Sequence, residues 1–340
     1  MSMNIAVFAD IHGRVLLAFT LCARWERETG EKIDLILQAG DLGAFPNADA
    51  LDRATRSHAK ADPSELGFMT DFGAYDATVA ATLAQTTCPM LCVRGNHEDH
   101  VWLDGLEERS ASPIFSIDPY QRIWMLKTGV PYTLHVKQWQ GQSADSERNN
   151  SAQAPSGSAE DDSAGLSIIG VGRIGAPTDF FAAERSMGQH GGSRLDAGHW
   201  RKNDPDPRGR RNRYIAPEES ARIQALRLRS CNVLLTHDCA RDAMAPGSGS
   251  DDIGWLLQET RPRYHFFGHY GGPCMTRTDR NGATYVCKLA DLHWNPSDYG
   301  QRLEDGSMGM LRWNSADDHT FEVVGAPWLR EYTARSWRYL

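Results

Sequence analysis

Residues that can bind metal ions or transfer protons follow several apolar runs in this 340-residue chain. They are Asp10, His12, Asp41, Asn96, His97, His237 and His269. Any one of them has an ordinary explanation, because Asp and Asn start helices and turns, and a lone His is commonly a hydrogen-bonded core or surface residue. Their recurrence at the ends of apolar runs predicts that they meet in one site.

The mixture of side chains at these positions indicates which metal such a site would take. Carboxylate and imidazole groups together with an amide oxygen suit Mn, Fe, Zn or a similar first-row metal. They suit neither a calcium site nor a thiolate site.

The elements that position these residues are predicted from the apolar runs. Three early runs, NIAVFADIHG, IDLILQAGDLG and CPMLCVRGNHE, are predicted to be buried strands, with helical patterns near residues 15–29, 49–60 and 75–84. This alternation predicts a parallel sheet with right-handed crossovers, and ligands of such sheets lie at the carboxyl ends of the strands.

The second half repeats the pattern less regularly. Strands are predicted in LSIIGVGRIG, CNVLLTHDCA, PRYHFFGHYGG and ATYVCKLADLHW. A helix is predicted over residues 217–230, with Pro217 in its first turn and arginines toward its end. A hairpin is predicted over residues 309–325.

The chain is predicted to form one domain over residues 1–340 with two insertions and a tail. Residues 140–165 are rich in Ser, Ala, Asn and Asp, which predicts a disordered insertion. Residues 176–214 are rich in Gly, Arg and Pro and lack periodicity, which predicts a functional or disordered loop. Residues 305–340 are predicted as the C-terminal hairpin and tail.

Composition narrows the class of protein. Hydrophobic residues make up 41% and charged residues 24%, as in globular proteins. No apolar run approaches the roughly 20 residues that cross a bilayer. The seven cysteines form no C-x-x-C pair, which is typical of reduced, buried thiols. The first apolar run carries polar residues of the predicted site and is therefore not a signal peptide, so we expect a soluble, cytoplasmic protein.

In order, DIH, GDLG, RGNHE, THD and GHYG resemble the motif series of the calcineurin-like metallophosphoesterases, written D-x-H, G-D, G-N-H-E/D, H and G-H-x-H. Each motif alone is short, but their combination from Asp10 to His269 is specific. The resemblance implies an α/β fold of two packed β-sheets flanked by helices, an αββα arrangement. It also implies a dinuclear metal site at the strand ends and hydrolysis of a phosphate ester by metal-bound hydroxide.

By position, the resemblance also implies a role for each polar residue. Asp10 and His12 would bind the first metal, Asp41 would bridge both, and Asn96, His237 and His269 would bind the second. His97 would be the catalytic residue that contacts the phosphate or protonates the leaving oxygen, a role that suits imidazole because the pKa of the free group lies near neutrality. The implied cofactors are two divalent ions, with Mn as the first choice and Fe, Zn, Ni or Mg as alternatives.

One position departs from the family pattern. Gly271 stands where many relatives have a histidine that completes the shell of the first metal. The phosphoprotein phosphatase branch also lacks that histidine and is active. His293 is a candidate replacement ligand, as is His265, and a structural role is the alternative for each.

Around the motifs, the chain is most similar to the lariat-debranching branch, in GDLGAFPNADALDRA, LLTHDCA and LLQETRPRYHFFGHYG. That branch usually has cysteine in place of His12 and keeps the final histidine, so the likeness implies a shared scaffold, with RNA branch cleavage as one possibility. The G-D-x-x-D-R-G motif of the protein phosphatases is absent, because this chain has GDLGAFPN.

A locally basic segment supplies candidate substrate-binding residues. Arginines match phosphate oxygens with their forked guanidinium groups, and a solvated loop is the alternative. The candidates are Arg173, Arg210, Arg211 and Arg213. Aromatic residues in the same segment could stack on bases. The overall pI of about 5.8 argues against a general nucleic-acid-binding surface.

Several functions fit these features. A nucleotide or nucleic-acid phosphodiester is the leading substrate class, followed by small phosphomonoesters and phosphoproteins. The alternative from another class is a regulatory protein that binds metal or nucleotide and has lost efficient catalysis through Gly271. A purely structural role would leave the placement of Asp, His and Asn unexplained.

Overall fold

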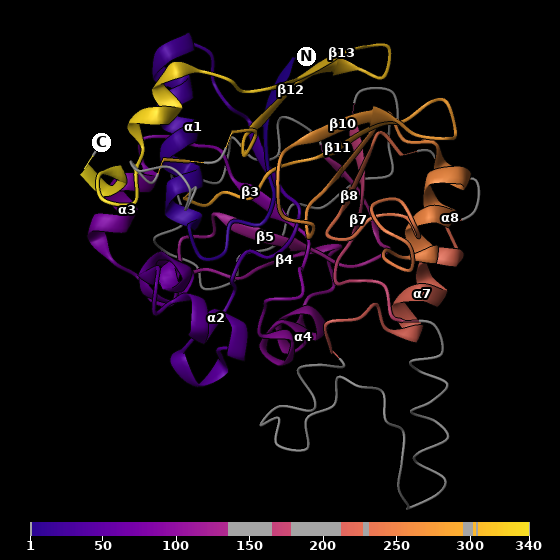
Figure 1. Ribbon diagram of the computed structural model, residues 1–340, viewed down its shortest axis with the longest axis horizontal. Helices are drawn as coiled ribbons and strands as arrows, with labels where there is room; N and C mark the ends of the chain where they lie inside the picture. Colours follow the sequence, from indigo (N-terminus) through magenta and orange to yellow (C-terminus); the bar gives the residue numbers. More distant parts are fainter. Residues whose placement is uncertain are drawn as a thin grey trace, which may run out of the picture.

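Two β-sheets pack face to face in the computed structural model, which describes residues 2–134, 165–177, 212–226, 231–294, 302–303 and 305–339 (Figure 1). Across the first, seven-stranded sheet the order is β13 (Asp318–Val323), β12 (Gly309–Ser315), β1 (Met3–Phe8), β2 (Leu35–Gln38), β3 (Met90–Cys92), β5 (Ile123–Leu126) and β4 (Ile114–Ser116). Across the second, six-stranded sheet it is β10 (Met275–Thr278), β11 (Tyr285–Lys288), β9 (Tyr264–Phe267), β8 (Val233–Thr236), β7 (Leu166–Val171) and β6 (Pro131–Leu134).

The centre of each sheet is parallel, as predicted. Strands β1, β2, β3 and β5 pair in parallel, and so do β7, β8, β9 and β11. Antiparallel strands flank both centres, including the predicted hairpin β12–β13, which pairs with β1. The carboxyl ends of parallel neighbours lie at one edge of a sheet, so each centre can gather the residues that follow its strands.

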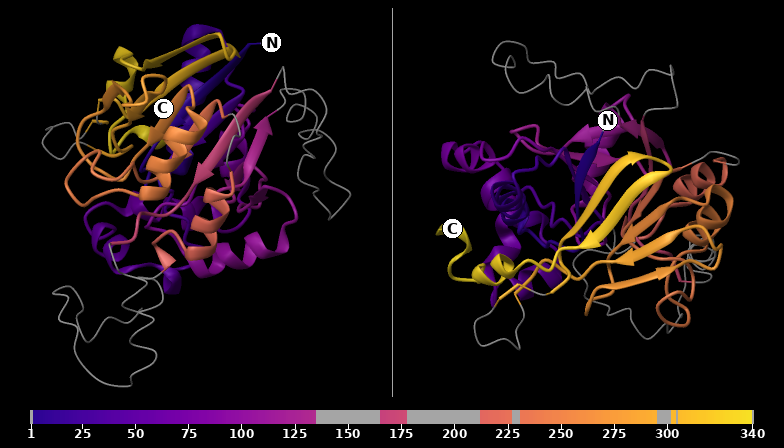
Figure 2. Two further views of the ribbon diagram at one scale, coloured as in Figure 1. Left: turned by 90° about the vertical axis from the view of Figure 1, so that its right-hand side faces the viewer. Right: turned by 90° about the horizontal axis from the view of Figure 1, so that it is seen from above.

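Helices cover the outer faces of the two sheets, which gives the αββα arrangement that the resemblance implies (Figure 2). The helices are α1 (Val15–Thr29), α2 (Arg53–His58), α3 (Ala77–Leu83), α4 (His100–Arg109), α7 (Pro217–Gln224) and α8 (Asp251–Thr260). Short helical turns span Ala48–Ala50, Pro63–Leu66, Phe68–Phe72, Pro327–Glu331 and Trp337–Tyr339. Helices α1 and α3 share a core with the first sheet, and α7 and α8 share one with the second.

The alternation of β1 explains why its sequence is apolar throughout. Ile5 and Val7 point into the core between the two sheets, whereas Ala6 and Phe8 pack toward α1 and its neighbours. All four side chains are fully buried. A strand covered on both faces carries a continuous apolar run, and burial of each such side chain contributes about 1.5–3 kcal/mol.

Most predicted elements of the first 100 residues are present, and α1 has the predicted bounds. Strands β4, β5, β6 and β10 and helices α4 and α8 were not predicted; these strands contain only three or four residues, too few for a periodic pattern. Helix α7 ends at Gln224, earlier than predicted. The predicted insertions lie almost entirely outside the described residues. None of the helices in the described ranges is long and apolar enough to span a bilayer.

Candidate active site

The loops after β1 and β2 are joined by backbone hydrogen bonds beyond the ends of the strands. The amide of Asp10 donates to the carbonyl of Gly40 (3.1 Å), and the amide of His12 donates to the carbonyl of Asp41 (2.9 Å). On the second sheet, the amide of Gly268 donates to the carbonyl of His237 (3.2 Å). The polar residues that follow these strands are thereby held in a fixed relation, as the sequence pattern predicts.

Asp41 lies at the centre of the predicted metal site. Its Oδ1 is 3.4 Å from Nε2 of His237, and its Oδ2 is 3.8 Å from Nε2 of His12. The amides of Asn96 and His97 both donate to Oδ1, at 2.7 and 2.8 Å. Each carboxylate oxygen thus faces a histidine on a different side, as a bridging ligand requires.

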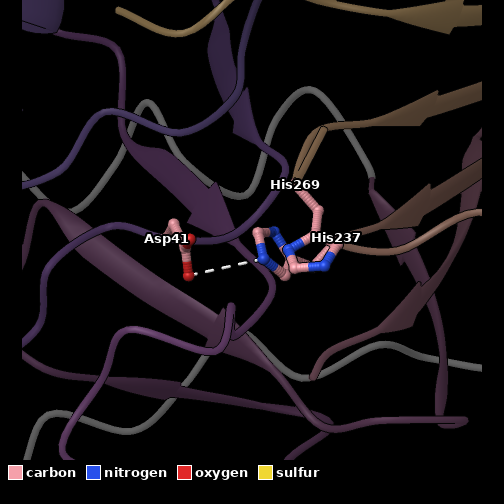
Figure 3. A group of neighbouring side chains, drawn as sticks. All are labelled: Asp41, His237 and His269. Atoms are coloured by element: carbon pink, nitrogen blue, oxygen red, sulfur yellow. Dashed lines mark ion pairs between the residues drawn. The ribbon is translucent and has the colours of Figure 1, made fainter. Parts of the chain in front are cut away.

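His237 and His269 form one potential metal-binding group with Asp41, within 4.8 Å of one another (Figure 3). The ring of His237 is fully buried and lies 4.9 Å from that of His269. Its Nδ1 is 3.0 Å from the carbonyl oxygen of Ala39, and its Nε2 is 3.0 Å from Oδ1 of Asn96. When Nδ1 donates to a carbonyl, Nε2 is left as the metal ligand, which is the common arrangement in metal sites.

Asp10, His12 and Asp41 form the second potential metal-binding group, so Asp41 belongs to both. Asp10 is buried, and both of its carboxylate oxygens accept from the amide of His269 (3.1 and 2.9 Å). Burial, followed by the charges of Asp41 and Asp291, raises the pKa of Asp10. Burial lowers the pKa of His12 to about 3 and that of His269 to about 4, so both rings are neutral at pH 7.

These groups fit two divalent cations. The donors are carboxylates and imidazoles with an adjacent amide oxygen, and divalent first-row metals bind such sets. The repulsion that buried Asp41 and half-buried Asp291 exert on buried Asp10 is the kind that a bound cation relieves.

The backbone is strained where it presents the predicted ligands. Asp10, His12, Asp41 and His269 all have positive φ, between 41° and 68°. A positive φ is uncommon for residues other than glycine and clusters at functional sites. Glycine is required beside two of these carboxylates, because a Cβ on Gly95 would overlap Asp41 and a Cβ on Gly268 would overlap Asp10.

His97 lies beside this centre and is paired with Asp52, the residue that caps α2. Nδ1 of His97 is 2.6 Å from Oδ2 of Asp52, and Oδ1 of Asp52 accepts from the amide of Thr55 (2.7 Å). Burial lowers the pKa of His97, but the charges of Asp41 and Asp52 outweigh it and raise the pKa to about 9. His97 is therefore protonated at pH 7 and can donate a proton.

Sequence reasoning missed Asp52 as a site residue. It lies 45 residues before His97, and no spacing rule links the two positions. Glu98 was also given no role, although it is part of RGNHE. Its buried carboxylate accepts from the amides of Leu42 (2.9 Å) and Ala44 (2.6 Å) and so holds the loop that carries Asp41.

Lys288 binds the loop that contains Gly271, the position at which the chain differs from the family pattern. The buried ammonium of Lys288 donates to the carbonyls of Tyr270, Gly271 and Gly272, at 2.8, 2.9 and 2.8 Å. It therefore holds the loop that follows His269. A Cβ at position 271 would meet open space, with Oδ2 of Asp291 the nearest atom at 3.9 Å.

The two candidate replacement ligands, His293 and His265, are not members of the metal-binding groups found among the described residues. Nδ1 of His293 is 3.4 Å from the carbonyl oxygen of Asp291. His265 is buried, with Nε2 2.8 Å from the hydroxyl of Thr236, which is a structural contact.

Two of the four candidate substrate-binding arginines, Arg173 and Arg213, are among the described residues, and their surroundings differ. Arg173 is buried and occupied by protein groups: it donates to Glu219 (3.3 Å), Asp104 (2.8 Å) and the carbonyl of Asn212. These contacts orient the segment that carries Arg213, and they leave Arg173 in a positioning role. Arg213 lies in a groove beside His97. The other two candidates, Arg210 and Arg211, lie outside the described residues.

Comparison with known proteins identifies the family to which the chain with this site belongs. The model of the calcineurin-like phosphoesterase family matches residues 3–272, and the chain belongs to this family. It is therefore a metal-dependent hydrolase of phosphate esters, and the family usually binds two divalent ions.

Among solved structures, the chain is similar to TT1561 of Thermus thermophilus, with 13% identity and a TM-score of 0.45. It is also similar to a conserved uncharacterized protein, a predicted phosphoesterase, from Streptococcus pneumoniae, with 8% identity and a TM-score of 0.29. Each alignment covers 95% of this chain and 99% of the other. No curated protein sequence matches the chain.

Proposed function

We propose that this phosphoesterase hydrolyses phosphodiesters of the nucleotide type, with Asp10, His12, Asp41, Asn96, His237 and His269 as metal ligands. The observation that carries the site assignment is the position of Asp41, whose two oxygens face His237 and His12 in two adjoining metal-binding groups. Two divalent ions held there, with Mn as the first choice, would neutralise phosphate charge and lower the pKa of a water molecule.

The chain's own residues account for the rest of the reaction. Protonated His97 gives its proton to the leaving oxygen as the P–O bond breaks, and the oxygen of water forms the new bond to phosphorus. Asp52 keeps the ring oriented and charged. Glu98 and the amides that donate to Asp41 keep the ligand in place without taking part in proton transfer.

A diester is favoured over a phosphomonoester or phosphoprotein by the surroundings of His97. A wide groove adjoins His97, and it leaves room for a second large ester group. Phosphomonoesters and phosphoproteins remain the alternative substrates, and a test with matched esters separates them from diesters.

The test is metal content by mass spectrometry on protein purified without chelator, together with hydrolysis of bis-p-nitrophenyl phosphate and p-nitrophenyl phosphate in Mn. We expect about two metals per chain and preferential turnover of the diester. The His97→Asn variant should keep its metals and lose about 100-fold or more in kcat. Preferential monoester turnover would contradict the diester assignment.

A regulatory role is the second candidate, and Gly271 favours it because the position lacks the usual imidazole and offers no replacement side chain. A regulatory protein would have substoichiometric metal and negligible turnover with every metal added. The same mass-spectrometric measurement therefore separates it from the enzyme.

A further inference from the structure

A groove of about 1060 Å³ is lined by His97 and by the neighbouring Asn96. It lies between α2 and α4, whose positions are visible in Figure 1, and residues Asn212 and Arg213 close one side of it. This volume is at the upper end of the range for small-molecule sites, about 300–1,000 Å³. Among its lining residues, the reaction proposed above uses Asp52, Asn96, His97 and Glu98.

His100, the first residue of α4, lines this groove and has no hydrogen-bonding partner for either ring nitrogen among the described residues. Its side chain is buried, with 4% of the residue exposed. An unsatisfied buried polar group costs about 1–3 kcal/mol, and native structures contain few of them. A polar group of a ligand in the groove would supply the missing partner.

Arg213 contributes a cation to the same wall of the groove. Its Nε is buried and unpaired within the described ranges. The amide of Ile174 donates to its carbonyl (2.9 Å), and Arg173 donates to the carbonyl of the preceding Asn212. Arg213 lines the groove together with His97 and His100. The backbone that carries it is thus held in place before a ligand arrives.

Three of the four acidic residues that line the groove are engaged by other protein groups, and the fourth, Asp49, is exposed. Asp52 is paired with His97, Asp99 accepts from the amide of Trp102 (3.1 Å), and Glu98 is buried against the Asp41 loop. Arg53 and Lys60 add two further cations to the lining. A guanidinium beside an unpartnered imidazole is suited to a phosphate, which presents several acceptor oxygens.

We propose that this groove binds the leaving group of the substrate and that Arg213 and His100 recognise a second phosphate carried by that group. The proposal rests on the proposed function, because the groove adjoins His97, the residue that faces the leaving oxygen in that reaction. The scissile P–O bond breaks, its oxygen takes the His97 proton, and the departing alcohol with its phosphate lies in the groove. The substrate class is therefore a nucleotide diester with a further phosphate.

The test compares dinucleotides that differ only in a terminal phosphate: dithymidine monophosphate, and the same compound with a phosphate at its 5′ or its 3′ end. In the wild-type protein with Mn we expect one terminal phosphate to raise kcat/KM by about tenfold or more. Arg213→Ala should reduce that ratio to about one, Arg213→Lys should retain part of it, and His100→Phe should lower it while filling the same space.

Arg109→Ala is the matched control, because this exposed arginine lies at the end of α4 and does not line the groove. It should leave the ratio at the wild-type value. An unchanged ratio in Arg213→Ala, or no preference in the wild-type protein, would overturn the proposal while the diesterase assignment stands. Absence of turnover for every ester would instead overturn the proposed function. Thermal unfolding of each variant verifies that it is folded.

Discussion

His97 and Asp52 set the proton chemistry of the proposed site at the scale of single residues. Burial alone would lower the pKa of His97, but the adjacent carboxylates of Asp41 and Asp52 raise it to about 9. A proton donor is active only below its own pKa. In the proposed reaction, a pair of residues on different loops would therefore set the alkaline limit.

Replacing Asp52 with Asn should move that alkaline limit to lower pH, because the charge that favours the protonated ring is lost. The fall in kcat for bis-p-nitrophenyl phosphate above about pH 9 should begin at lower pH in the variant. Asp76→Asn is the control, since Asp76 caps α3 as Asp52 caps α2 and is exposed. Identical pH profiles for the two variants would refute the assignment.

Gly271 is the second residue whose replacement is informative. Its position is open to a side chain, so Gly271→His should fold normally and raise Mn affinity by about tenfold, as measured by calorimetry. Gly272→His is the contrasting variant, because Gly272 has φ of 79° and a side chain there is strained. Unchanged Mn affinity in a folded Gly271→His protein would show that the loop does not face the first metal.

At the scale of elements, α7 anchors the segment that carries Arg213. Glu219 in its first turn accepts from Arg173 (3.3 Å) and from the amide of Ala216 (2.8 Å), and both charged residues of the pair are buried. Arg173 in turn holds the carbonyl of Asn212. One buried carboxylate therefore links the start of a helix to a wall of the groove.

Glu219→Ala should lower the free energy of unfolding by about 3 kcal/mol, since it leaves a buried guanidinium without one of its charge partners. Glu218→Ala, the exposed neighbour in the same turn, should change it by less than about 0.5 kcal/mol. Urea unfolding measures both. Equal effects would mean that the ion pair does not secure this segment.

At the scale of the whole molecule, the site joins the two sheets. Asp10 and Asp41 follow strands of the first sheet, whereas His237 and His269 follow strands of the second. Ions bound by both sets would hold the layers together, and a ligand that binds only the folded state stabilises it by mass action.

Mn at about 100 times its Kd should therefore raise Tm by about 5 °C or more over protein treated with chelator. Asp41→Asn should abolish most of this increase, because Asp41 belongs to both metal-binding groups. Differential scanning calorimetry with and without Mn measures the effect. An equal increase in wild-type and variant protein would place the stabilising ions elsewhere.

The order of polar residues after apolar runs predicted a parallel sheet and indicated where the site lies, and the resemblance of the motifs to a known series implied the family and the two packed sheets. Such runs mark strands that are buried on both faces, and parallel strands bring the residues that follow them to one edge. These features depend on neighbours along the chain, so the sequence records them locally. Asp10, Asp41 and His237 could be singled out as candidates for this reason.

Contacts between distant loops were decided only by the tertiary structure. Asp52 meets His97 because α2 begins beside the loop after β3, and Lys288 holds the Gly271 loop because β11 pairs with β9. Arg213 lines the groove beside α4 because Arg173 donates to the carbonyl of Asn212 and the amide of Ile174 donates to the carbonyl of Arg213. No periodicity or spacing in the sequence predicts such contacts, since they depend on how the layers pack against one another.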